Sequence, residues 1–259
     1  MNILIGDIGN TDTKICLVDA RSFKIKKEFR FNSCKISSKN FLLKKIKFLK
    51  RYGPLMKTAL FSCVVPKYES QMNKLLRKIY KIDLIEIKYK KINKIVNVNI
   101  KNKNQVGSDR IANAVGAYKK YKTNCIVLDF GTATTFDVVT KNGNYNGGII
   151  APGINLSIKS LSISANQIPS FSLKKQKKTI GKNTIEALRS GFYWGYSGLI
   201  NNIIFKIEKE TKKKYKIIFT GGYANLFKTS ILRPFIIDKN ITIKGIIEIF
   251  KNNRKYLSK

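Results

Sequence analysis

The sequence predicts an α/β protein built from two related halves, each with a sheet and covering helices. Two observations carry this prediction: one strand-and-turn pattern occurs twice, about half a chain apart, and strand-like and helix-like patterns alternate between the copies. With 259 residues, 43% of them hydrophobic, the chain is long and apolar enough for two cores. We expect the domains at residues 1–118 and 119–259.

The first copy opens the chain. The apolar segment Met1–Ile5 runs into a polar turn at Gly6–Lys14, and a second β pattern follows at Ile15–Val18. Strand, glycine-containing turn and strand together are typical of a hairpin. This turn is richer in Asp and Thr than a simple connection needs.

The second copy lies at Cys125–Val139. With a shift of 122 residues, Asp7 aligns with Asp129 and Thr13 with Thr135. Both copies then read D-x-G-[NT]-x-x-T after an apolar strand, and two such matches at this spacing indicate an internal duplication.

The composition of these turns suits a phosphate ligand. Glycine lets backbone N–H groups approach a phosphate, hydroxyl and amide side chains donate hydrogen bonds, and a carboxylate can hold a cation. The alternative is a pair of ordinary hairpins whose polar side chains satisfy their own backbones. Four of the eight aspartates lie in or beside such turns, which favours a binding site; they are Asp7, Asp109, Asp129 and Asp137.

Between the copies, apolar periodicity predicts a mixed or parallel sheet with covering helices. The expected elements are a helix near 40–51, a strand at 58–65, a helix near 68–80 and a strand at 84–87.

A glycine-led segment, Gly107–Ala114, opens the next predicted helix. Ser108 can cap this helix, which runs to about Lys122. Asp109 in its first turn either complements the helix dipole or acts as a general base that accepts a substrate hydroxyl proton. In the second case Arg110 would orient an anionic group.

The second half combines glycine-rich loops with helices. We expect a loop at Gly147–Gly153, helices at 155–164 and 185–190, and an interruption by glycines at 191–198. These glycines favour close helix or subunit packing as much as ligand contact. The strand Ile217–Phe219 ends in Thr220–Ala224, followed by a helix, where the sugar and base of a nucleotide could lie against backbone.

Several functional classes are excluded. The chain has no histidine, which removes Ser-His-Asp triads, Cys-His pairs and most zinc sites. It also lacks GxxxxGK[ST] and GxGxxG, so neither a P-loop nor a Rossmann nucleotide site is expected.

The net charge of +36 comes from 43 lysines and only 8 arginines. Base-edge and bidentate phosphate recognition depend on arginine, so we attribute the charge to drift in an A/T-rich genome and expect no specific nucleic-acid partner. The four cysteines show no paired spacing, and no apolar run reaches the roughly 18 residues of a membrane span. We therefore expect reduced thiols and a cytoplasmic protein that does not cross a membrane.

Six segments, in order, resemble the motifs of type III pantothenate kinases, a family of the actin-like, sugar-kinase and heat-shock ATPase superfamily. They are D-x-G-N-T-x-x-K (Asp7–Lys14), G-x-D-R-x-A-N-A (Gly107–Ala114), D-x-G-T-A-x-T-x-D (Asp129–Asp137), G-G-x-I-x-P-G (Gly147–Gly153), I-G-x-x-T-x-x-A-x-x-S-G (Ile180–Gly191) and T-G-G-x-A (Thr220–Ala224). The resemblance implies two actin-like (ribonuclease H-like) domains with an ATP cleft between them.

The resemblance also implies ATP-dependent phosphorylation of pantothenate to 4′-phosphopantothenate, the first step towards coenzyme A. Magnesium and a monovalent cation, K⁺ or NH₄⁺, are the implied ions, and a homodimer is the implied assembly. The ATP-binding residues would be Gly6, Asp7, Ile8, Gly9, Asn10, Thr11, Asp12, Thr13 and Thr132. Pantothenate would be held by Gly107, Ser108, Asp109, Arg110 and Thr184, with Asp109 as the base and Asp129 on the monovalent cation.

Two positions depart from the family pattern. The aromatic residue usual seven positions before the glycine of G-x-D-R is Ile100 here, and a common proline is Lys103. Either change could weaken pantothenate binding or reflect drift. The alternatives to this function are another small-molecule kinase of the superfamily, a nucleotide-binding regulator, or a basic nucleic-acid-binding protein.

Overall fold

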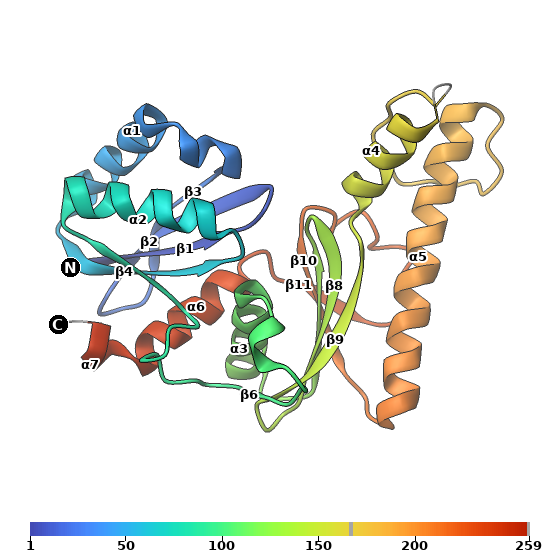
Figure 1. The fold of residues 1–259 in the computed structure, drawn as a ribbon. Coiled ribbons are helices and arrows are strands. Elements are labelled where there is room, and N and C mark those ends of the chain that lie inside the picture. The colour runs from blue at the N-terminus through green and yellow to red at the C-terminus, as the bar shows by residue number, and fades with distance from the viewer. Residues whose placement is uncertain (166–167, 258–259) are drawn as a thin grey trace. The chain divides into compact units, whose positions relative to one another are not determined.

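The computed structural model describes residues 1–165 and 168–257, with side chains throughout except at 48–50. Figure 1 shows the elements along the chain. The strands are β1 (Asn2–Ile8), β2 (Asp12–Asp19), β3 (Ile25–Asn32), β4 (Leu55–Cys63), β5 (Asp83–Glu86), β6 (Asn97–Val98), β7 (Cys125–Phe130), β8 (Ala133–Val139), β9 (Asn144–Pro152), β10 (Lys216–Gly221) and β11 (Phe235–Ile237). The helices are α1 (Lys39–Leu49), α2 (Pro66–Tyr80), α3 (Ser108–Tyr121), α4 (Ile154–Ser164), α5 (Thr184–Thr211), α6 (Ile241–Asn252), α7 (Arg254–Leu257) and the 3₁₀ helices η1 (Ser33–Ser37), η2 (Lys50–Tyr52) and η3 (Lys103–Gln105).

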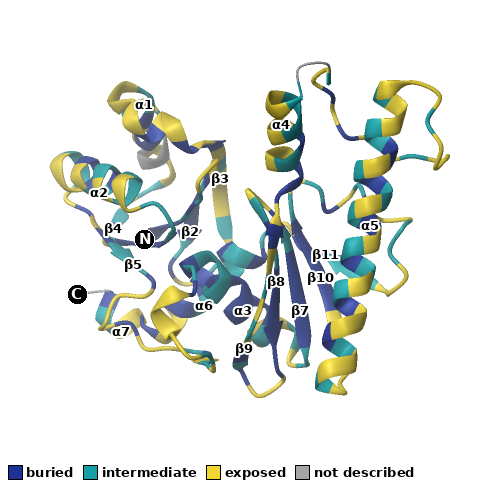
Figure 2. Cartoon of the chain, turned by 45° about the vertical axis from the view of Figure 1, so that its right-hand side comes forward, coloured by how far each residue is buried: buried dark blue, intermediate teal, exposed yellow. Residues whose placement is uncertain are grey.

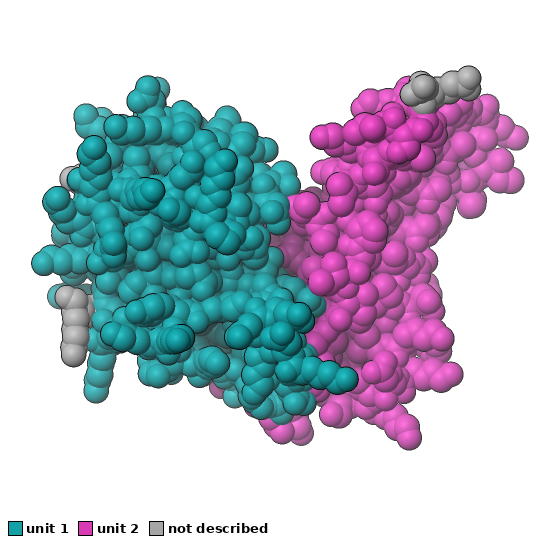
Figure 3. Space-filling model, in the orientation of Figure 1, with its two compact units in different colours: residues 1–120, 143–145, 240–259 teal, residues 121–142, 146–239 magenta. Residues whose placement is uncertain are grey.

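The chain divides into two compact units, which Figure 3 colours separately. Unit 1 comprises Met1–Lys120, Gly143–Tyr145 and Asn240–Lys259, and unit 2 comprises Tyr121–Asn142 and Asn146–Lys239. Along the chain, unit 1 first gives way to unit 2 after Lys120, close to the domain boundary predicted at 118/119. The final segment belongs to unit 1 because α6 packs against β1 and β4. The boundary between independently folding domains stays a prediction.

The first sheet has the strand order β3-β2-β1-β4-β5. Its first three strands are antiparallel neighbours, whereas β4 and β5 run parallel to β1. The sheet is therefore mixed, as the alternation of strand and helix patterns predicted.

The second sheet repeats this arrangement. Its order is β11-β10-β7-β8-β9-β6, in which β7 pairs with β8 antiparallel and with β10 parallel. The hairpin β7–β8 corresponds to β1–β2, and β10 and β11 occupy the positions of β4 and β5. The duplication inferred from two turns thus extends to the topology of both sheets, and the predicted α/β class is confirmed.

The core of unit 1 lies on both faces of the first sheet. On one face, α1 and α2 contribute Leu42, Ile46 and Met72 to a cluster with Leu4 and Ile8 of β1. Ile3 and Ile5 lie on the other face, because side chains alternate along a strand. This second face is the one that remains for α6, which packs against β1.

The core of unit 2 joins its sheet to the long helix α5. Ile200 and Ile204 of α5 are fully buried in one cluster with Ile126 and Leu128 of β7. Figure 2 shows β7 and β10 mostly buried, while the residues of α5 alternate between buried and exposed.

The predicted interruption of this helix at 191–198 was wrong. α5 is a continuous helix of 28 residues. Each interior glycine costs about 1 kcal/mol relative to alanine, but Tyr193, Ile200 and Ile204 are buried on the same helix and stabilise it by packing.

The helix expected after Thr220–Ala224 was also wrong. Residues 222–230 form successive turns, with Leu226 N–H bonded to Tyr223 O and Ser230 N–H to Phe227 O. Such i→i+3 bonds close single turns and do not propagate an α-helix. Among the described residues, no helix combines the length and apolarity needed to cross a membrane.

Candidate active site

The first duplicated turn connects β1 to β2. Gly9 N–H donates to Asp12 O at 3.0 Å and closes the turn, leaving Asn10 and Thr11 exposed at its tip. Asp12 pairs with Arg30 at 3.0 Å across to β3. The tip therefore presents an amide, a hydroxyl and backbone groups that a ligand can reach.

A buried serine supports this turn from behind. Ser33 Oγ donates to Gly9 O at 2.7 Å, and Ser33 N–H donates to Thr11 O at 2.7 Å. Because the Ser33 proton is used on Gly9, the Thr13 hydroxyl is the donor in its 2.8 Å bond to Ser33 Oγ. Ser33 was not among the predicted residues, since no motif contains it.

The two turns differ in length by one residue. In the first, Ile8 pairs with Thr13; in the second, Phe130 pairs with Thr134. The ungapped alignment of Thr13 with Thr135 was therefore wrong, and Thr134 is the counterpart of Thr13. Both side chains are fully buried, with 0% exposure. A shorter loop at Gly131–Thr132 accounts for the shift, because β8 begins already at Ala133.

The second turn lies against two other predicted motifs. Gly221 has φ +82°, and a Cβ atom there would lie 2.7 Å from Asp129 Oδ1 and 2.5 Å from Phe130 O. The next N–H, of Gly222, donates to Phe130 O at 3.0 Å. A Cβ at Gly153 would lie 2.1 Å from Thr132 O. The motifs Thr220–Ala224 and Gly147–Gly153 thus meet Asp129 and Thr132 within unit 2.

Asp109 lies in the first turn of α3, in unit 1. Its Oδ1 accepts the N–H of Arg110 at 2.8 Å. Burial raises the pKa of Asp109, while the Arg110 N–H and the charges of Arg110 and Lys88 act in the opposite direction. A carboxylate with a raised pKa beside cations is suited to accept a proton from a hydroxyl group.

Ser108, also predicted, has a structural role. It is 2% exposed, and its hydroxyl lies 2.9 Å from both Cys63 N and Cys63 O, the last residue of β4. These contacts attach the start of α3 to the carboxyl end of the first sheet. Cys63 N–H donates to Ser108 Oγ, and the Ser108 hydroxyl donates to Cys63 O.

Arg110 lies over an aromatic ring that sequence reasoning missed. Its guanidinium is 5.9 Å from the centroid of Tyr145, a distance typical of a cation–π contact. Tyr145 is 1% exposed, and its carbonyl accepts the N–H of Asn99 at 2.9 Å, one residue before Ile100. The signal that could have found it is an aromatic residue just before the Gly147–Gly153 motif.

Thr184 is the exposed first residue of α5, in unit 2. Asn183 caps this helix by accepting the N–H of Glu186 at 2.9 Å, and the Glu186 carboxylate accepts Lys182 N–H at 2.8 Å. The Asn183 side-chain cap fixes where α5 begins, and the Glu186 carboxylate ties the preceding residue to the first turn. Lys14, the last residue of the first motif, pairs with Glu28 at 3.3 Å and donates to Asn240 Oδ1.

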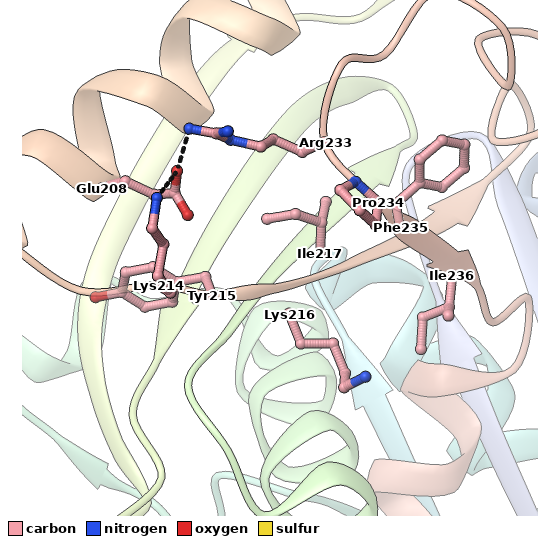
Figure 4. Close-up of a pocket in the computed structure, with 9 residues that line it drawn as sticks. All are labelled: Glu208, Lys214, Tyr215, Lys216, Ile217, Arg233, Pro234, Phe235 and Ile236. Carbon is pink, nitrogen blue, oxygen red and sulfur yellow. Dashed lines mark ion pairs between the residues drawn. The ribbon is translucent and has the colours of Figure 1, made fainter.

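A cavity of about 420 Å³ lies elsewhere in unit 2 (Figure 4). Its lining residues are Glu208, Lys214, Tyr215, Lys216, Ile217, Arg233, Pro234, Phe235 and Ile236. Glu208 pairs there with Arg233 at 2.9 Å. The cavity adjoins Lys216, the first residue of β10, whereas the Thr220–Ala224 motif lies at the other end of that strand. None of the predicted site residues lines it.

The chain is similar to known proteins over most of its length. Residues 3–206 match the family model for type III pantothenate kinase. A protein named type III pantothenate kinase from Pelagibacter ubique is 47% identical over 245 residues, covering 95% of this chain and 97% of the relative. Relatives from other bacteria carry the same name.

Solved structures show the same fold at low identity. A Campylobacter jejuni protein described as a Baf family transcriptional activator has a TM-score of 0.62 at 21% identity, covering 98% of this chain and 100% of that one. The activator of 2-hydroxyisocaproyl-CoA dehydratase from Clostridium difficile, solved with ADPNP bound, has a TM-score of 0.54 at 11% identity, covering 99% and 97%. These likenesses show that the fold of the chain is shared with solved proteins. With the family model spanning most of the chain, the chain belongs to the type III pantothenate kinase family.

Proposed function

We propose that this chain transfers the γ-phosphoryl group of ATP to the primary hydroxyl of pantothenate, with Asp109 as the general base. The observation that carries the proposal is the Asp109 carboxylate itself. Burial raises its pKa, and it stands beside Arg110 at the start of α3, inside the segment that matches the family model. The product is 4′-phosphopantothenate, the first intermediate on the route to coenzyme A.

The chemistry balances as an in-line displacement. The pantothenate hydroxyl oxygen forms a bond to the γ-phosphorus while the bond to the bridging oxygen breaks and ADP leaves. The hydroxyl proton passes to Asp109, and Arg110 orients an anionic group of the substrate. Most of the rate enhancement comes from positioning and charge neutralisation. The general base alone contributes a factor on the order of 10² to 10⁴ in rate.

The first turn is proposed to bind the ATP phosphates, with Thr132 adding a contact. Exposed Asn10 and Thr11 fit this role, because amide, hydroxyl and backbone N–H groups are phosphate donors. Magnesium, when bound with ATP, would neutralise the charge that develops on the phosphates.

We assign the monovalent cation, K⁺ or NH₄⁺, to Asp129. The residues fit an oxygen-ligated ion: Asp129 supplies a carboxylate and Thr132 a hydroxyl at the same turn. In the described part of the chain, no group of three His, Cys, Asp or Glu residues is placed to hold a metal ion. Besides the Asp129 carboxylate, a cation here would take oxygen donors from neutral groups such as Thr132, which suits a singly charged ion.

A homodimer formed through α5 is the proposed assembly. A Cβ atom placed at Gly191, Gly195 or Gly198 would have no neighbour within 4 Å. Phe205 on the same helix is 50% exposed. An apolar helix surface with small residues permits close approach of a second copy. Sedimentation velocity should show a dimer for the parent and a monomer for Gly195→Glu. A monomeric parent would overturn this assembly.

We also propose a cytoplasmic location, since all four cysteines are free and the cytosol keeps thiols reduced.

The decisive test of the substrate is ADP release with ATP, Mg²⁺ and K⁺, with pantothenate, a panel of sugars, or small acids as acceptor. We expect turnover with pantothenate alone, and phosphopantothenate as the product by mass spectrometry. Turnover with a sugar but not pantothenate would assign the chain to a different kinase activity. Nucleotide binding without turnover on any acceptor would support a regulator instead.

A further inference from the structure

The residues that follow β5 contact the segment leading into α3, although they belong to none of the six motifs. Lys88 Nζ donates to two backbone carbonyls of that segment, Asn104 O at 3.0 Å and Val106 O at 2.8 Å. Val106 is three residues before Asp109. One ammonium group therefore holds the chain on either side of residue 105, just before the proposed site.

The backbone of Lys88 is itself fixed. Glu86, the last residue of β5, accepts Lys88 N–H on its Oε2 at 2.7 Å. Ser108, the first residue of α3, is bonded to the backbone of Cys63 at the end of β4. The end of β4 thus holds the start of α3, and Lys88, two residues after β5, holds the preceding loop.

Charge-assisted hydrogen bonds to carbonyl groups are stronger than neutral ones, and loops without such contacts are more mobile. An Asp109 carboxylate displaced by 1 Å would lose on the order of 100-fold in rate. The loop from Asn102 to Gly107 has only the short helix η3 as regular structure. Its geometry therefore depends on contacts such as those of Lys88.

We propose that Lys88 is a positioning residue for Asp109: its ammonium group fixes the loop that places the carboxylate. The proposal deepens the function proposed above and rests on it.

A second effect of Lys88 gives a readout that loop disorder alone would not. Burial raises the pKa of Asp109, and the Lys88 and Arg110 charges lower it. Burial also raises the pKa of Glu86, which lies beside Lys88. Removal of the Lys88 charge should therefore raise the pKa of Asp109 further, so that the base becomes protonated at a higher pH.

The test compares Lys88→Met, Lys88→Arg and Lys90→Met in the full chain. Lys90→Met removes the same charge from an exposed neighbour two residues away and serves as the control. Thermal unfolding of each variant establishes that it is folded. Steady-state kinetics with pantothenate and ATP are then measured from pH 5 to 9.

We expect Lys88→Met to lower kcat about tenfold or more. In the pH profile of kcat/KM, the acid limb, where activity rises as the base loses its proton, should shift to higher pH. Lys88→Arg should keep the limb near its parental position and recover most of kcat, while Lys90→Met should match the parent. Parental kcat and pH profile in folded Lys88→Met would overturn the proposal, as would an unshifted limb.

Asp109→Asn, measured in parallel, distinguishes a failure of the role proposed for Lys88 from a failure of the proposed base. An inactive Asp109→Asn with parental Lys88→Met refutes only the role of Lys88. An active Asp109→Asn refutes the proposed base, whatever Lys88 does.

Discussion

Gly107 and Asp109 are in close contact: a Cβ atom at position 107 would lie 2.4 Å from Asp109 Oδ1. The same hypothetical atom would be 3.6 Å from the Val64 side chain, an ordinary contact distance. The absence of a side chain at Gly107 therefore makes room for the proposed base.

Gly107→Ala should lower kcat with little change in stability. The clash is with the end of the Asp109 side chain, which can rotate away without moving the backbone. We expect kcat to fall by about 10- to 100-fold, while the urea midpoint stays near the parental value. Parental kcat in this variant would contradict the placement of the carboxylate.

Gly221→Ala should instead damage the structure of unit 2. Position 221 has φ +82°, and the new Cβ would lie 2.5 Å from Phe130 O, a backbone atom that cannot rotate away. The expected loss is about 1–3 kcal/mol in the free energy of unfolding. Gly222→Ala is the matched control, because its nearest contact would be 3.9 Å. Urea denaturation of both variants checks this, and equal midpoints would refute the contact with the Asp129 turn.

Ser33→Ala should weaken ATP binding. The substitution removes the hydroxyl that bonds Gly9 O and Thr13 Oγ1 behind the first turn. We expect a loss of about 1–3 kcal/mol in stability and a rise in KM for ATP. Ser37→Ala, which removes an exposed hydroxyl bonded to Gln71 Oε1 at 3.1 Å, should leave KM unchanged. If both variants bind ATP alike, Ser33 does not support the phosphate turn.

Alkylation of cysteines tests the fold itself. Burial raises the pKa of the Cys16, Cys63 and Cys125 thiols to about 12. At pH 8 only about one part in ten thousand of each is then thiolate, the reactive form. Iodoacetamide should modify exposed Cys34 alone in the native protein and all four residues in urea. Mass spectrometry counts the adducts, and rapid native labelling of Cys125 would contradict the buried β7.

Elements defined by a local pattern could be predicted from the sequence alone. The helix starting at Ser108, the strand around Ile217–Phe219 and both glycine turns follow from apolar spacing, capping residues and glycine. The duplication was visible because two copies of one turn recur. Membership of a nucleotide-dependent kinase family followed from the order of six motifs.

Features set by tertiary contacts were not predictable in this way. The continuity of α5 depends on the burial of Tyr193 and Ile200 against the second sheet, which outweighs three glycines. The one-residue difference between the turns became visible only in the strand register, where Thr134 lies opposite Phe130. Ser33 and Lys88 act through backbone carbonyls distant in sequence, and such contacts leave no local pattern.

Asp109→Asn should be inactive without being less stable. The raised pKa means that folding favours the neutral carboxyl group. That favourable contribution is fully present below the unfolded-state pKa and is lost as the pH rises through the folded-state pKa. At neutral pH the ionised carboxylate therefore opposes folding, and a neutral amide removes that penalty. Thermal unfolding of Asp109→Asn at pH 7 should give a midpoint at or above that of the parent.

The most direct test of the central claim is the pantothenate-dependent release of ADP by the parent and by Asp109→Asn at pH 7. If Asp109 accepts the hydroxyl proton, the parent turns over only with pantothenate, and kcat of the variant falls by about 10² or more. A folded Asp109→Asn that phosphorylates pantothenate at the parental rate would contradict the account.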